Sequence, residues 1–145
     1  REILLLHQIR QVMPNVTALN MPKNGCHFHA YVSIHDPLPG QARQLGMLLF
    51  GLDHYLKLVV VVDSDIDVFD EERVWWACAT RFQANRDLFQ VDGARCNALD
   101  PSSQGGVAAK LSLDATCPPG FEGTPITLPP EVRARAQAML KEELP

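Results

Sequence analysis

Apolar residues recur along this chain with two periods, one typical of helices and one typical of strands. In residues 1–13, Leu5, Ile9 and Val12 lie three or four positions apart, which predicts an amphipathic helix. Residues 27–34 alternate between apolar and polar side chains, which predicts a strand with one apolar and one polar face. Helices and strands therefore both belong to the fold.

The most apolar part of the chain is residues 58–62, an unbroken run of leucine and valine. A strand of this kind is covered on both faces, so we expect it at the centre of a sheet. The same periods predict strands at residues 16–21, 86–91 and 107–113, and a helix from 42 to about 51. A further helix is predicted after the central strand, with Asp67 or Asp70 as its cap and with the buried stripe Val74, Cys78 and Phe82. This order predicts an α/β fold, a layered sheet of mostly parallel or mixed strands flanked by helices.

Two segments follow neither period. Residues 92–106 are rich in Gly, Asn, Asp, Pro and Ser, which predicts a loop, and loops of this length are often functional. Residues 117–130 are rich in proline, so we expect an extended arm. A final helix is predicted after it, with Val132, Ala136 and Met139 on its apolar side.

Length and composition narrow the class of protein. With 145 residues the chain can bury one core, so we assign residues 1–118 to a single α/β domain and residues 119–145 to an arm and C-terminal helix of that domain. The net charge of −4 argues against nucleic acid or a membrane as a partner, and no apolar run is long enough to span a bilayer. The four cysteines form no CxxC pair and follow no secretory segment, which favours a cytoplasmic protein. Because Arg1 already lies inside a helical pattern, we expect a fragment of a longer protein.

The acidic stretch at residues 63–70 has the carboxylates of a calcium loop but not its spacing. An EF-hand needs Gly where Val68 stands and a bidentate Glu where Val74 stands. We therefore favour a turn followed by a helix cap. A metal-dependent hydrolase that uses Asp63, Asp65 and Asp67 stays open as an alternative.

Two further groups have the residue types of reactive sites. Cys26, His27 and His29 are zinc-ligand types on one strand, but no second Cys/His cluster accompanies them, so we assign no metal site. Residues 71–73 include two glutamates and an arginine, but successive helix positions point in different directions. No GxGxxG, P-loop or GxSxG motif occurs, so we assign no catalytic residue.

Three segments, in order along the chain, resemble one enzyme family. The sequence LKLVVVVDSDIDVFD at 56–70, continued by WWACATR at 75–81, resembles the strand, acidic turn and helix ending in A-T-R of the UbiD family of aromatic-acid decarboxylases. The other segments are HAYVSI with PGQA at 29–42, and LDPS with KLSLDAT at 99–116. The resemblance covers residues 1–118, and Ser64 departs from it because family members usually carry another Asp there.

The resemblance implies reversible decarboxylation of aromatic, heteroaromatic or α,β-unsaturated acids on prenylated FMN. In that family a β-barrel domain that precedes this one holds the flavin, its divalent metal and potassium, together with a catalytic Glu-Arg-Glu set. A flavin prenyltransferase supplies the cofactor. We therefore expect no catalytic, cofactor-binding or metal-binding residue in this chain, and no activity from it alone.

The resemblance implies that this domain forms one wall of the substrate cleft and part of the subunit interface of a homodimer or larger oligomer. The substrate-side residues that it implies are Arg95, Cys96, Asn97 and Leu99. The alternative is a stand-alone oligomerisation or binding module of the same fold without catalysis, because a fold alone does not fix an activity.

Overall fold

The computed structural model describes residues 1–124, 126 and 128–143, and its centre is a five-stranded mixed sheet. The strands are β1 (Val16–Asn20), β2 (His29–Ile34), β3 (Leu58–Asp63), β4 (Leu88–Arg95) and β5 (Val107–Ala115), in the order β1-β2-β3-β5-β4. The middle strands β2, β3 and β5 are parallel, and each edge strand is antiparallel to its neighbour. The predicted α/β sheet is confirmed.

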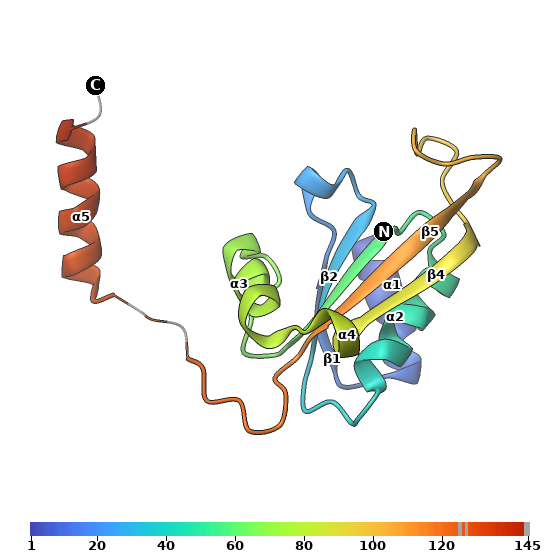
Figure 1. Ribbon diagram of the computed structural model, residues 1–145, viewed down its shortest axis with the longest axis horizontal. Coiled ribbons are helices and arrows are strands. Elements are labelled where there is room, and N and C mark those ends of the chain that lie inside the picture. The colour runs from blue at the N-terminus through green and yellow to red at the C-terminus, as the bar shows by residue number, and fades with distance from the viewer. Residues whose placement is uncertain (125, 127, 144–145) are drawn as a thin grey trace.

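Helices cover both faces of this sheet (Figure 1). The helices α1 (Glu2–Val12) and α2 (Gln41–Leu52) pack on one face, and α3 (Glu71–Arg81) packs on the other. Strand β3 lies between these two layers, and Val59, Val60, Val61 and Val62 are all fully buried. The prediction that the valine run is the central strand is therefore confirmed.

Strand β2 is buried on both faces, which its alternating pattern did not predict. Tyr31 and Ser33 belong to the predicted polar face, yet both are buried. The ring of Tyr31 packs edge-on against Trp75 of α3, and the Ser33 hydroxyl lies 2.6 Å from that of Thr17. Ser33 can be covered because its hydroxyl has a hydrogen-bond partner, and Tyr31 can because its ring packs against another aromatic ring.

Helix α2 lies unusually close to the sheet at Gly46. A Cβ atom at this position would lie 2.4 Å from Ser112 Oγ on β5, so a glycine lets the helix and the strand touch. The helix follows Gly40, whose φ of 79° lies in the left-handed region that favours glycine.

The segment between β3 and α3 is a turn and a cap, as we favoured. It returns across the sheet, where Asn20 donates to the carbonyl of Val68 at 2.8 Å. Asp70 caps α3 by accepting from the Arg73 amide, and Asp67 accepts from the Phe69 amide within the turn. Asp70 is therefore the helix cap.

The predicted buried stripe of α3 is wrong in part. The buried residues are Val74, Ala77 and Arg81, whereas Cys78 is only half-buried and Phe82 lies past the end of the helix. Hydrophobic spacing does not select Arg81 because its burial depends on paired carboxylates, which are described below.

The predicted strand at 86–91 and loop at 92–106 need a correction. The short helix α4 (Ala84–Asp87) occupies the start of that range, and β4 continues to Arg95. The pairing of β4 with β5 shifts register between Val91 and Ala94, and Gly93 has a φ of 64°. This β-bulge has the composition of a loop but continues the strand. The loop itself is residues 96–106.

The chain leaves β5 as an extended arm that leads to α5 (Pro130–Glu143), which stands apart from the sheet in Figure 1. Every α5 side chain described, as far as Met139, is exposed. A 3-10 turn, η1 (Lys23–Gly25), completes the elements. Among the described helices, none combines the length and the apolar character that a membrane span requires.

Candidate functional site

The loop at residues 96–106 joins β4 to β5 and is closed at its neck. The Cys96 amide donates to the carbonyl of Gly106 at 3.0 Å, and Gln104 and Val107 exchange two hydrogen bonds of 3.2 Å. Gly105 and Gly106 both have positive φ angles, which lets the chain reverse there. The loop therefore leaves the sheet from a fixed base.

Within this loop, Asn97 organises a tight turn. Its Oδ1 accepts from the Leu99 amide at 2.9 Å, and its own carbonyl accepts from the Asp100 amide at 3.0 Å. Asn97 is buried, with 7% of its surface exposed, whereas Leu99 is 80% exposed. Asn97 Nδ2 donates no hydrogen bond to the residues that the structure describes, and it is not one of the fully buried atoms without a partner, so it keeps contact with solvent. The turn thus leaves an apolar side chain outside and an amide donor without a protein partner.

Asp100, which closes this turn, is held by Lys57, the residue just before β3. Asp100 Oδ1 accepts from Lys57 Nζ at 3.0 Å, from the Ser102 amide at 3.0 Å and from the Ser102 hydroxyl at 2.8 Å. Asp100 Oδ2 lies 2.8 Å from Lys57 Nζ but off the hydrogen-bond direction, so charge alone holds it. The hydrogen bond from Lys57 lowers the pKa of the Asp100 carboxyl below its usual range.

Lys110 is a second lysine at this end of the sheet, and it is 2% exposed. Its Nζ donates to the carbonyls of His54 and Leu56, at 2.9 and 2.6 Å, and lies 5.5 Å from the centre of the Phe50 ring. Burial lowers the pKa of Lys110. The amine therefore fastens the segment between α2 and β3 that ends at Lys57.

The four residues implied by the resemblance are not equivalent in the structure. Arg95 ends β4 and is exposed, and Leu99 is exposed at the turn, whereas Cys96 and Asn97 are buried within the domain. The structure brings Asn97 and Leu99 together in one turn. Lys57 and Lys110 went unnoticed in the sequence, where they only interrupt apolar runs.

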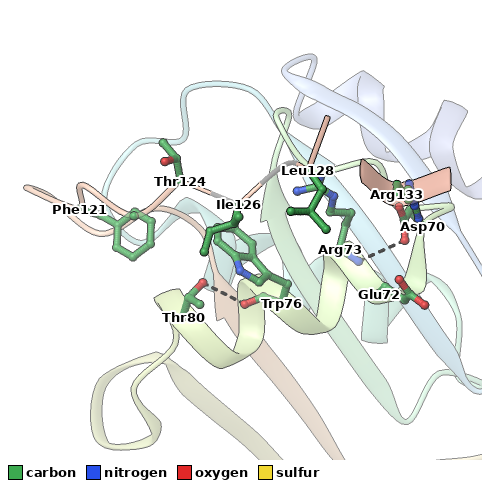
Figure 2. Close-up of a pocket in the computed structure, with 11 residues that line it drawn as sticks. Asp70, Glu72, Arg73, Trp76, Thr80, Phe121, Thr124, Ile126, Leu128 and Arg133 are labelled. Carbon is green, nitrogen blue, oxygen red and sulfur yellow. Dashed lines mark hydrogen bonds between the residues drawn. The ribbon is translucent and has the colours of Figure 1, made fainter. Parts of the chain in front are cut away.

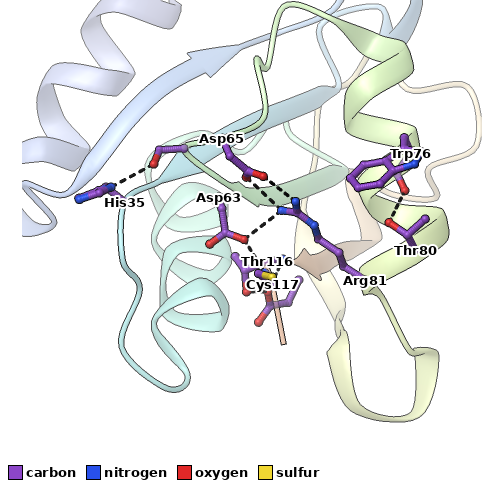
Figure 3. A network of polar contacts seen from close by, with 10 residues as sticks. His35, Asp63, Asp65, Trp76, Thr80, Arg81, Thr116 and Cys117 are labelled. Carbon is purple, nitrogen blue, oxygen red and sulfur yellow. Dashed lines mark hydrogen bonds and ion pairs between the residues drawn. The ribbon is translucent and has the colours of Figure 1, made fainter. Parts of the chain in front are cut away.

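At the opposite, carboxyl end of the parallel strands, Arg81 binds two carboxylates (Figure 3). Arg81 Nη1 donates to Asp63 at 3.2 Å and to Asp65 at 3.1 Å, and Nη2 donates to Asp65 at 2.6 Å. Asp63 also accepts from the Cys117 amide, where the arm begins. Arg81 is only 4% exposed, so this fork of hydrogen bonds joins β3, α3 and the arm at a buried point.

The pKa values of the two carboxylates shift in opposite directions, although Arg81 acts to lower both. Hydrogen bonds from Arg81 lower the pKa of Asp65, which is partly exposed. Burial raises the pKa of Asp63 and outweighs the opposing effects of the Cys117 amide and Arg81. Because a guanidinium already occupies both carboxylates, and Asp67 caps a turn, the arrangement does not support the metal-dependent hydrolase.

Potential metal ligands elsewhere do not gather either. Cys26 and His27 have positive φ angles in an exposed turn before β2, and the His29 ring lies against Gly25. Among the residues that the structure describes, no group of three His, Cys, Asp or Glu side chains is placed to hold a metal. His35 Nδ1 and Ser64 Oγ lie 3.0 Å apart, but both side chains are exposed on open surface.

A cavity of about 870 Å³ lies between α3 and the arm (Figure 2). Trp76, Phe121, Ile126 and Leu128 form its apolar wall, and Arg73 and Arg133 lie toward one end. The Arg81 guanidinium contacts the rings of both Trp76 and Phe121, at 5.4 and 5.5 Å from their centres. These contacts tie the start of the arm to α3.

Comparison of the sequence and comparison of the structure with known proteins both lead to one family of enzymes. Residues 1–115 match the family described as the 3-octaprenyl-4-hydroxybenzoate carboxy-lyase C-terminal domain. The chain is 42% identical over 119 residues to an anhydromevalonate phosphate decarboxylase of Aeropyrum pernix, covering 81% of this chain and 27% of the relative. It is 33% identical over 132 residues to a gallate decarboxylase of Lactiplantibacillus plantarum, again covering 81% and 27%.

Solved structures agree with these relatives. The UbiD-class enzyme HmfF of Pelotomaculum thermopropionicum, solved with FMN, superposes with a TM-score of 0.81 at 38% identity, covering 99% of this chain and 32% of that one. The vanillic acid decarboxylase of Sedimentibacter hydroxybenzoicus superposes with a TM-score of 0.75 at 29% identity, covering 97% and 31%. The chain thus spans about a quarter to a third of the length of these proteins. It belongs to the UbiD family, as a C-terminal domain of the carboxy-lyase type.

Proposed function

We propose that this chain is the C-terminal domain of an enzyme that reversibly decarboxylates aromatic, heteroaromatic or α,β-unsaturated acids with prenylated FMN. The family match and the decarboxylase names of the relatives support a carboxy-lyase. An evolved dimeric form of HmfF was solved with prenylated FMN, which supports this cofactor. The whole enzyme would be a soluble protein of the cytoplasm.

The chemistry would lie outside this chain. The described residues gather no metal ligands, and Arg81, the buried cation at the carboxyl end of the parallel strands, is already bound to two aspartates. These residues do not fit a flavin with its divalent metal and potassium. The cofactor, supplied by a flavin prenyltransferase, and the Glu-Arg-Glu set would belong to a preceding domain, and this chain alone would be inactive.

The role of this chain would be to form one wall of the substrate cleft. The observation that carries this proposal is the turn at Asn97, which exposes Leu99 while leaving the amide donor of Asn97 without a protein partner. An apolar contact beside one polar donor suits a ring that carries a hydroxyl or a heteroatom. Arg95 and Cys96 flank the turn as further candidate contacts.

Substitution of Asn97 in the full-length enzyme tests this role. A buried amide that faces a ring without a partner costs about 1–3 kcal/mol, so substrates with a suitable hydroxyl should be preferred by roughly 5- to 150-fold. Asn97→Ala should remove this preference and leave flavin binding intact. The measurement is the relative kcat/KM across benzoates, furoates and cinnamates. If it is unchanged in Asn97→Ala, Arg95→Ala and Cys96→Ala alike, this loop does not form a wall of the substrate cleft.

The second role would be self-association into a homodimer or larger oligomer. The arm and α5 carry exposed apolar side chains, among them Ile126, Val132 and Met139. Exposed apolar surface of this kind marks interaction sites. Met139→Lys should shift sedimentation toward the monomer, whereas a monomeric wild-type chain at high micromolar concentration would favour another partner for this surface.

The stand-alone module is the rival reading. A gene product that continues before Arg1 with a flavin-binding barrel and decarboxylates aryl acids would exclude it. A full-length protein that neither binds flavin nor releases carbon dioxide would establish it instead.

A further inference from the structure

We propose that Lys57 is a positioning residue, which locks the loop at residues 96–106 through Asp100 and Ser102 and thereby sets where Asn97 and Leu99 lie. This inference rests on the proposed substrate wall. It adds a residue that touches no substrate and that lies outside the loop it controls.

Lys57 binds two residues of the loop, Asp100 and Ser102. Its Nζ lies 3.0 and 2.8 Å from the two oxygens of Asp100, and it donates to Ser102 Oγ at 2.7 Å. Ser102 Oγ in turn donates to Asp100, so the three groups close a small ring of polar contacts. Asp100, the one charged residue of the loop, is therefore neutralised by the residue just before β3.

The lock reaches Asn97 through the backbone. Asp100 accepts from the Ser102 amide, and its carbonyl accepts from both the amide and the hydroxyl of Ser103. On the other side, the Asp100 amide donates to the carbonyl of Asn97. Displacement of Asp100 would therefore disturb the turn that exposes Leu99.

The backbone of Lys57 is held on both sides. Its amide donates to the carbonyl of Phe28, just before β2, at 2.7 Å, and its carbonyl accepts from the amide of Leu111 on β5 at 2.8 Å. Lys110 fastens the preceding residues through the carbonyls of His54 and Leu56. The backbone of Lys57 is therefore fixed, so only its side chain has to be ordered when the amine binds Asp100.

Hydrogen exchange in this chain tests the lock without any activity. Lys57→Met and Asp100→Asn should each speed exchange of the Leu99, Asp100 and Ser103 amides by about tenfold, because their hydrogen bonds open locally. Lys57→Arg should restore most of the protection. Arg86→Met, which breaks an exposed ion pair at the far end of the sheet, is the matched control and should leave these amides unchanged.

Kinetics of the full-length enzyme then separates positioning from simple stabilisation. Lys57→Met should raise KM for the preferred ring substrates by about tenfold and compress the ranking of substrates, with little change in flavin binding. A structural role alone would lower the melting temperature without changing the ranking.

The outcomes distinguish the two proposals. Amides that stay protected in both Lys57→Met and Asp100→Asn overturn the lock, whatever the activity. Loosened amides with an unchanged ranking overturn the positioning role if Asn97→Ala does change the ranking. If neither variant changes it, the loop is not a substrate wall, and the proposed function of the loop fails while the lock itself stands.

Discussion

Each end of the sheet pairs a cation with carboxylate groups, but the two ends use different cations and hold different segments, and of these two cations only Arg81 is buried. At the amino end of the parallel strands, Lys57 binds Asp100 in a loop that leaves the sheet. At the carboxyl end, Arg81 binds Asp63 and Asp65 and contacts the arm. Arginine offers a rigid fork of donors, whereas a lysine amine is a point charge on a flexible stem.

The difference indicates that one end stabilises the whole domain and that the other positions a single loop. Arg81 joins three elements of the fold, so its loss should affect the whole domain. Lys57 fixes one loop on a sheet that is complete without it, so its loss should act locally. Stability measurements on variants at the two ends test this contrast.

The largest effect is expected for Arg81→Met. It leaves Asp63 and Asp65 without their cation at a buried point, which should lower the free energy of unfolding by about 2–3 kcal/mol. Urea denaturation of this chain measures the loss. Arg81→Lys keeps the charge without the fork of donors, so it should recover part of the lost free energy of unfolding. If Arg81→Met loses no more free energy of unfolding than Lys57→Met does, the two ends do not differ in this way.

A smaller, more local loss is expected for Lys110→Met. The carbonyls of His54 and Leu56 would lose their donor, which should cost about 1–3 kcal/mol, partly offset because a buried charge is removed. Thermal denaturation measures the cost, and hydrogen exchange should localise it to residues 53–57. Loosening that spreads to α3 would show that the two ends are coupled.

The smallest effect is a change in acid sensitivity. Arg81 holds the pKa of Asp65 below its ordinary value of 3.8, so this carboxylate contributes stability above that value and loses it as the pH falls through its lower, folded-state pKa. Asp65→Asn should therefore lose less stability than the wild type over this acid range. Asp63, whose pKa is raised by burial, has the opposite sign, and its contribution is lost as the pH rises.

Denaturation midpoints of wild type, Asp65→Asn and Asp63→Asn, each taken from neutral pH into acid, would measure these signs. Parallel curves for the three proteins would show that the pKa values of the two carboxylates do not shift in opposite directions.

The sequence predicted those parts of the fold that depend on local pattern. The central strand followed from its valines, and the cap of α3 was narrowed to Asp67 or Asp70, of which the structure has Asp70. The bulge at Gly93 was read as a loop, because local composition does not reveal that β5 continues to pair beyond it.

The candidate site was less predictable because its contacts are distant in sequence. The loop and its residues came from family resemblance, and their contact with substrate stays a prediction. Lys57 is 43 positions from Asp100, and Lys110 is 56 and 54 positions from the carbonyls it binds. Arg81 was left out of the buried stripe because hydrophobic spacing cannot foresee a charge that carboxylates bring inside.

The β-bulge near Gly93 has a consequence for how copies of this chain can meet. An edge strand with regular, unpaired backbone groups invites another strand to pair with it, and a bulge or a charged side chain prevents this. Strand β4 has the bulge and ends in the exposed Arg95, while on the other edge Arg10 donates to the carbonyls of Val16 and Thr17 in β1. Because both edge strands resist pairing with a further strand, aggregation by strand addition between molecules is disfavoured.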